Sequence, residues 1–149
     1  MHPFDLKTIV FAKHAQHVVL IHFPIALFIA GVAFDFLAEW RKQRLLAAAA
    51  YYNFFIAALM TIPVLITGIL AWHWQLEGQR LKGILLMHLI AGCVSSVLIW
   101  VVWLLHRRAR PEDGGSLPGY RLPVETAAVA LVMLTGHLGG FLSGVNVPS

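Results

Sequence analysis

Three histidines lie inside long apolar segments of the chain, where lipid-facing positions normally carry hydrocarbon. His22 follows the start of the first segment, His88 follows the start of the third, and His137 precedes the end of the fourth. Ionisable side chains are costly inside a membrane and usually serve a function there. Imidazole is the commonest metal ligand in proteins and also an axial ligand of haem iron. These residues therefore indicate ligation of a metal ion or of haem iron.

The composition indicates that four membrane-spanning helices carry the histidines. Of the 149 residues, 59% are hydrophobic and 12% are charged, which is typical of an integral membrane protein. Four apolar runs each approach the roughly 20 residues that a helix needs to cross ~30 Å of hydrocarbon. We predict one all-α domain, an up-down-up-down four-helix transmembrane bundle with a short interfacial helix at its N-terminus. The predicted spans are residues 15–39, 45–73, 83–106 and 122–143.

The alternating direction of the helices converts sequence position into depth. At a rise of 1.5 Å per residue, His22, His88 and His137 all lie roughly 6–9 Å below the surface that bears both termini. His17 lies nearer the same surface, and His106 belongs to the opposite one. We therefore predict a layer of imidazoles near one face of the membrane.

A b-type haem with two axial histidines is the cofactor that this layer favours. Spans one and three are expected to be diagonal in the bundle, so His22 and His88 are the predicted ligand pair, with His137 and His17 as second choices. His17 and His22 are five positions apart, about 140° around a helix, and cannot both face one iron. Small residues would admit a porphyrin, and a loop cation would neutralise its propionates; these residues are Gly92, Gly136, Gly140 and Arg80.

Two alternative uses of the same layer stay open. Met87 adjoins His88 and Met133 precedes His137 by one turn, so a histidine–methionine copper site in a metal or small-solute transport protein is the first alternative. In the second alternative, the histidines only join helices by hydrogen bonds. The protein would then be an accessory subunit of a membrane complex without a cofactor.

Two further residues inside the spans carry specific expectations. Pro24 removes a helical N–H, which frees the Leu20 carbonyl near His22 for a ring N–H or simply kinks the helix. Asp35 is taken as the one carboxylate within a span. It is expected to snorkel or to pair with Arg44 or Arg107, with a role in proton relay as the alternative.

The basic residues indicate the orientation of the chain. The face with the loops between spans 1–2 and 3–4 carries Arg41, Lys42, Arg44, Arg107, Arg108, Arg110 and Arg121, whereas the other face carries Lys7, Lys13, Arg80 and Lys82. The richer side should be cytoplasmic, which places both termini in the periplasm. Because this placement accounts for the net charge of +4, nucleic acid is not an expected partner.

Several short motifs are similar to those of a known family. They are His17 followed by His22-Phe23-Pro24, Thr67-Gly68 with Trp72, His88, Gly136 with Gly139-Gly140, and Gly144-Val145-Asn146-Val147. With these motifs the chain resembles a bacterial family of small four-span membrane proteins, domain of unknown function 2231. It departs from the family at Ala71, where an acidic residue is usual, and by lacking a tyrosine between Gly140 and Gly144.

The resemblance implies the four-span fold, important histidines and a redox-associated role in the bacterial inner membrane. Together with the histidine layer, it leads us to expect a haem-binding electron-transfer subunit rather than a stand-alone enzyme. Its context would be a larger respiratory or photosynthetic redox complex. The expected partners are the lipid bilayer, other membrane redox subunits or a cytochrome, and a quinone.

Overall fold

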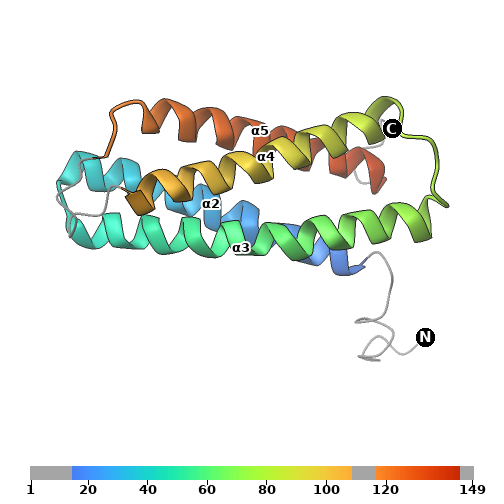
Figure 1. Ribbon diagram of the computed structural model, residues 1–149, viewed down its shortest axis with the longest axis horizontal. Helices are drawn as coiled ribbons and strands as arrows, with labels where there is room; N and C mark the ends of the chain where they lie inside the picture. The colour runs from blue at the N-terminus through green and yellow to red at the C-terminus, as the bar shows by residue number, and fades with distance from the viewer. Residues whose placement is uncertain (1–14, 109–116, 145–149) are drawn as a thin grey trace.

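The computed structural model describes residues 15–108 and 117–144, which form four long helices (Figure 1). These are α2 (Ala15–Arg41), α3 (Arg44–Gln75), α4 (Gly83–Arg108) and α5 (Arg121–Leu142). All four are long and apolar enough to cross a membrane. The prediction of an all-α four-span bundle is confirmed, and every predicted span ends within two residues of a helix end. The predicted interfacial helix lies almost wholly before Ala15, outside the described residues.

The connections explain where the helices end. Only Lys42 and Gln43 separate α2 from α3, and Lys42 adopts the left-handed conformation with φ 52°. Such a residue commonly ends a helix, because it turns the chain away from the helix axis. Gly83, with φ 57°, takes the same conformation at the first residue of α4. Both sharp turns leave little chain outside the apolar spans.

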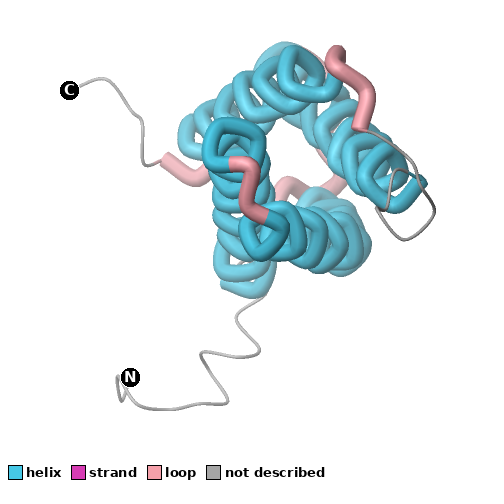
Figure 2. Tube along the Cα trace, turned by 90° about the vertical axis from the view of Figure 1, so that its left-hand side faces the viewer, coloured by secondary structure: helices cyan, strands magenta, loops and turns pink. Residues whose placement is uncertain are grey.

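The helices form two antiparallel hairpins that close into a ring. α2 packs most extensively on α3, and α4 packs on α5; the contacts of α3 with α4 and of α2 with α5 are smaller. The view along the bundle shows the four helices around a common axis (Figure 2). Helices α2 and α4 are therefore diagonal, as predicted from the order of the spans.

The buried core lies toward one end of the bundle. We call this the loop end: α2 ends there, α3 begins, α4 ends and α5 begins (Figure 1). The opposite end, which holds the α3–α4 connection, is the terminal end. At the terminal end, only Pro24 and Leu138 are buried among residues 16–24, 62–74, 83–90 and 133–144. The core cluster consists of Phe28, Val32, Ala50, Phe54, Ala57, Ala58, Ile99, Val102, Trp103, Ala128 and Val132.

Small residues bring α2 and α3 together at the loop end. The Phe28 and Phe54 rings pack with their centroids 5.6 Å apart, and both side chains are fully buried. A Cβ atom on Gly31 would lie 2.7 Å from the Phe54 ring. Because the lipid environment removes most of the hydrophobic drive between helices, such close packing is what holds them.

Candidate functional site

His17 is anchored to α3 in a defined tautomer. Its Nδ1 lies 3.2 Å from Thr67 Oγ1, and the Thr67 hydroxyl in turn donates to the Pro63 carbonyl at 2.8 Å. Since Thr67 has one hydroxyl proton and directs it at a carbonyl, Thr67 Oγ1 accepts from His17 and Nδ1 carries the ring proton. The ring lies against Gly68, where a Cβ atom would come within 3.0 Å of His17 Cε1.

His88 is anchored to α5 in the same way. Its Nδ1 lies 3.0 Å from the Thr135 carbonyl, which can only accept, so Nδ1 again carries the proton. Thr135 Oγ1 donates to the Leu131 carbonyl at 2.8 Å and accepts from Ser95 Oγ at 3.1 Å, which gives α4 and α5 a second link. A Cβ atom on Gly139 would lie 3.1 Å from His88 Cε1.

We call His17, Thr67, His88 and Thr135 the histidine site. Each hairpin supplies one imidazole and the group that holds it. The inter-helix hydrogen bond of each ring is made by Nδ1, and the His17 ring also lies beside the Val64 carbonyl. In the tautomers described, each Nε2 presents an unshared electron pair, which is what a metal ligand requires.

His22 and His137 lie outside this pair. His22 is exposed, and its Nδ1 donates to the Val18 carbonyl of its own helix at 2.6 Å. The acceptor is therefore not the Leu20 carbonyl that Pro24 was expected to free. His137 is exposed and its ring packs edge-on against Phe141, with centroids 5.0 Å apart. The pairing of His22 with His88 stays a prediction, but the geometry favours His17.

The other residues predicted for this layer are spread around it. Gly92 and Gly136 are partly buried and have room for a Cβ atom, whose nearest neighbours would be 3.8 Å and 3.9 Å away. Gly140 is partly buried and its carbonyl accepts from Ser143, whereas Arg80 is exposed in the α3–α4 connection. The methionines of the copper alternative, Met87 and Met133, are exposed by 56% and 62%.

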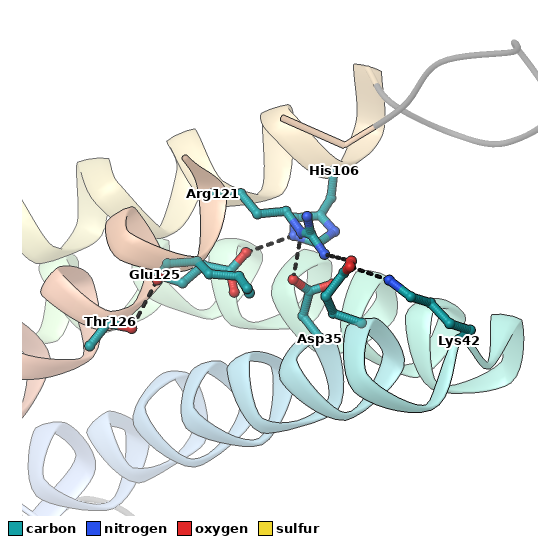
Figure 3. Close-up of polar contacts among 8 residues, drawn as sticks. Asp35, Lys42, His106, Arg121, Glu125 and Thr126 are labelled. Atoms are coloured by element: carbon teal, nitrogen blue, oxygen red, sulfur yellow. Dashed lines mark hydrogen bonds and ion pairs between the residues drawn. The ribbon is translucent and has the colours of Figure 1, made fainter. Parts of the chain in front are cut away.

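A second polar cluster lies at the loop end, buried among the helices (Figure 3). Arg121 Nε donates to Asp35 Oδ2 at 2.8 Å, and an Nη atom of the same guanidinium donates to Glu39 Oε2 at 2.8 Å. Asp35 is 1% exposed and Arg121 is 6% exposed. Glu39, on the rim, also pairs with the exposed Lys42. The arginine thus ties the start of α5 to the end of α2.

The same cluster contains a histidine and a second carboxylate. His106 Nε2 and Glu125 Oε1 lie 2.9 Å apart, and both side chains are buried. The Phe54 ring covers His106, with centroids 4.8 Å apart. We call Asp35, Arg121, His106 and Glu125 the ionic cluster. It draws residues from α2, α4 and α5.

Two expectations about this end are wrong. Asp35 pairs with Arg121 and not with Arg44 or Arg107, because Arg121 is the first residue of α5 and extends into the bundle beside α2. Asp35 is also not the one carboxylate within a span, because Glu125 is fully buried in the second turn of α5. The apolar residues that follow Glu125 masked it in the sequence.

The family model for a predicted membrane protein, DUF2231, matches residues 13–146. The chain belongs to this family. No curated protein and no solved structure matches it. The family match thus covers all four helices of this DUF2231 protein. It supports a membrane protein in contact with the lipid bilayer and leaves the activity to be argued from the side chains.

The motifs that carry the resemblance come together in the folded DUF2231 chain. His17 opens α2 and meets Thr67-Gly68 near the end of α3, while His88 meets Gly139 in α5. Sequence reasoning had placed the glycine contacts elsewhere and had assigned no role to Thr67 or Thr135. A threonine is common in a transmembrane helix, where its hydroxyl can bond its own helix, so its type alone gave no signal.

Proposed function

We propose that the protein is a b-type haem-binding membrane subunit that transfers electrons within a larger redox complex. His17 and His88 would be the axial ligands, one from each hairpin. The observation that carries the proposal is the matched state of the two rings: both Nδ1–H groups are held by an acceptor on the neighbouring helix, which leaves the unshared electron pair of each ring on Nε2. Bound there, haem would supply one-electron redox chemistry.

The residues around the two rings fit such a group. A histidine that ligates a metal usually donates its other N–H to a carbonyl or a similar acceptor, which fixes the ring and raises its basicity. Thr67 and Thr135 provide these acceptors. Gly68 and Gly139 let the rings lie close to the backbone of the partner helix.

The packing of the bundle also favours a group at the terminal end. The core cluster fills the loop end, whereas the helices around the histidines bury little of their own surface. A flat, apolar prosthetic group between the hairpins would cover the partly exposed side chains that face it. The ligand positions would then be stabilised by contacts that the polypeptide alone does not make.

The ligand set supports an electron carrier and not a stand-alone enzyme. Two protein ligands fill both axial positions of a haem iron, which leaves none for a substrate. The described connections are short: two residues join α2 to α3, and residues 76–82 join α3 to α4. Electrons would therefore pass to a partner, and a membrane redox subunit, a cytochrome or a quinone meets that need.

The distribution of basic residues supports a place in the bacterial inner membrane with the histidine site on the periplasmic side. The loop end carries Arg41, Lys42, Arg44, Arg107, Arg108 and Arg121 in the described part of the chain, against Arg80 and Lys82 at the terminal end. Lysine and arginine are enriched in cytoplasmic loops.

The test is a reduced-minus-oxidised absorption spectrum of the protein purified in detergent. The wild type should show the Soret and alpha bands of b-type haem, and His17→Ala and His88→Ala should each reduce the bound haem at least tenfold. His73→Ala is the matched control, because His73 is exposed at the same end, and it should retain the full bands. His22→Ala should retain them as well.

Two results would reject this assignment. A colourless wild-type protein that takes up no added haem would show that the protein does not bind this cofactor. Loss of the bands in His22→Ala but not in His17→Ala would restore the pair His22 and His88.

A further inference from the structure

Two carboxylate oxygens in the ionic cluster are buried without a hydrogen-bond donor. These atoms are Asp35 Oδ1 and Glu125 Oε2, and they have no partner in the part of the chain that the structure describes. An ionised carboxylate is purely an acceptor, and a buried acceptor without a donor carries the cost of its lost hydration. Asp35 and Glu125 are 1% and 0% exposed, so bulk water does not supply the missing contact.

The three residues lie close enough together to bind one metal ion. Asp35, His106 and Glu125 each offer one ligand atom, and these atoms all lie within 4.8 Å of one another. They come from α2, α4 and α5 (Figure 3), so one ion would join three helices. A set of two carboxylates and one imidazole suits divalent first-row metals such as manganese, iron, cobalt and zinc.

The charges around the cluster leave room for a cation. Arg121 lies between Asp35 and Glu39 and donates to one oxygen of each, which leaves Asp35 Oδ1 unengaged. Glu39 also pairs with Lys42, so Arg121 and Lys42 together offset two of the three carboxylates, Asp35, Glu39 and Glu125. An ionised buried carboxylate without a compensating charge is costly. A divalent ion shared by Asp35 and Glu125 would supply that charge.

We propose that Asp35, His106 and Glu125 bind a divalent transition-metal ion at the loop end, independently of the histidine site. The ion would contact one carboxylate oxygen each of Asp35 and Glu125 and the His106 imidazole. The site lies less than two turns from the end of α2 and within two turns of the start of α5. Glu39, whose side chain is 45% exposed, bonds Arg121 on the rim of the site.

The experiment is a titration of the purified, detergent-solubilised protein with Co²⁺, followed by its d–d absorption. The wild type should bind one Co²⁺ per chain at the cluster, and Zn²⁺ should displace it. Glu125→Gln keeps the shape of the side chain and should weaken Co²⁺ binding at least tenfold. Glu77→Gln changes an exposed carboxylate in the α3–α4 connection and should leave binding unchanged.

A second pair of measurements separates this site from other causes of binding. His88→Ala should leave the Co²⁺ titration unchanged, because His88 belongs to the histidine site. In the wild type, bound Zn²⁺ should raise the midpoint of thermal unfolding, which tests the site even if Glu125→Gln does not fold.

Three results would overturn the proposal. They are a wild type that binds no Co²⁺, a Glu125→Gln protein that binds it as tightly as the wild type, or a titration that His88→Ala abolishes. In each case the ionic cluster would only join helices.

Discussion

Arg121 donates a 2.8 Å hydrogen bond to Asp35 across 86 positions of the sequence. The two residues belong to different hairpins, so this bond joins α5 to α2 at the loop end. At the terminal end, by contrast, each histidine of the histidine site bonds the neighbouring helix of its own hairpin. A buried ion pair therefore joins the two hairpins at the loop end, whereas the hydrogen bonds that hold the two imidazole rings lie within the hairpins.

Arg121→Met should destabilise the bundle strongly. Removing one partner of a buried ion pair leaves an uncompensated charge and costs about 3–5 kcal/mol. The double variant Asp35→Asn, Arg121→Met should recover much of this loss, because it removes both charges. The measurement is the free energy of unfolding in a titration with a denaturing detergent.

Lys42→Ala is the control for this prediction. Lys42 makes an ion pair with Glu39, but its side chain is 75% exposed, so its loss should cost about 0.5 kcal/mol or less. If Arg121→Met unfolds at the same detergent concentration as Lys42→Ala, the ionic cluster does not hold the hairpins together.

Gly31→Ala should weaken the packing of α2 on α3. The added Cβ atom would lie 2.7 Å from the ring of Phe54, which is fully buried and cannot move aside. Overpacking of this kind costs about 1–3 kcal/mol. In Gly92→Ala the nearest neighbour is Thr135 Cγ2 at 3.8 Å, and stability should stay near that of the wild type. Equal stability of the two variants, measured in the same detergent titration, would contradict the close contact.

Gly139→Ala should disturb haem binding although both proposed ligand residues are left in place. A Cβ atom at this position would lie 3.1 Å from His88 Cε1 and would push the ring from its place. Gly136→Ala is the matched control, because its nearest neighbour would be Ile25 Cδ1 at 3.9 Å. We expect a lower haem content or a shifted Soret band for Gly139→Ala alone, measured in the purified proteins. Identical spectra for the two variants would count against His88 as a ligand.

Thr67→Val should weaken the hold on His17 while keeping the shape of the side chain. Loss of such a supporting bond typically costs 10–100-fold in metal affinity. Thr67→Ser keeps the acceptor and should restore both the haem affinity and the midpoint potential. The readout is a haem titration of the apoprotein together with a redox titration. A Thr67→Val protein with the affinity and potential of the wild type would show that Thr67 does not position His17.

The orientation can be tested with single cysteines in a chain that carries Cys93→Ala. A cysteine in place of Gln79, in the α3–α4 connection, should react with a membrane-impermeant maleimide added outside spheroplasts. A cysteine in place of Lys42 should react only after the membrane is opened, because the basic loop end is expected to face the cytoplasm. The opposite labelling pattern would place the histidine site on the cytoplasmic side.

The fold follows closely from the sequence because a membrane leaves few choices. Four apolar runs of sufficient length, separated by charged or glycine-containing turns, specify four helices, and short connections specify antiparallel neighbours. The diagonal placement of α2 and α4 follows from the order of the spans. The rotation of each helix about its axis does not follow, because its surface is apolar nearly all round.

The rotation of α2 about its axis decides which of its histidines faces the neighbouring helix. Depth alone could not separate His17 from His22, and the two lie on different faces of α2, one against Thr67 and one exposed. The ionic cluster was hidden for a related reason. Asp35 and His106 were visible as polar residues, but their grouping with Arg121 and Glu125 depends on how α5 begins beside α2. The carboxylate of Glu125, close to the start of the fourth apolar run, was the signal in the sequence that could have revealed it.

The most direct test of the account is the low-temperature electron paramagnetic resonance spectrum of the oxidised protein. If His17 and His88 both ligate haem iron, the wild type gives a low-spin ferric signal, His17→Ala loses that signal because most haem is lost and any haem that stays bound becomes high-spin, and His22→Ala leaves the signal unchanged. A wild-type spectrum without a low-spin ferric haem signal, or one that His17→Ala does not alter, would contradict the central claim.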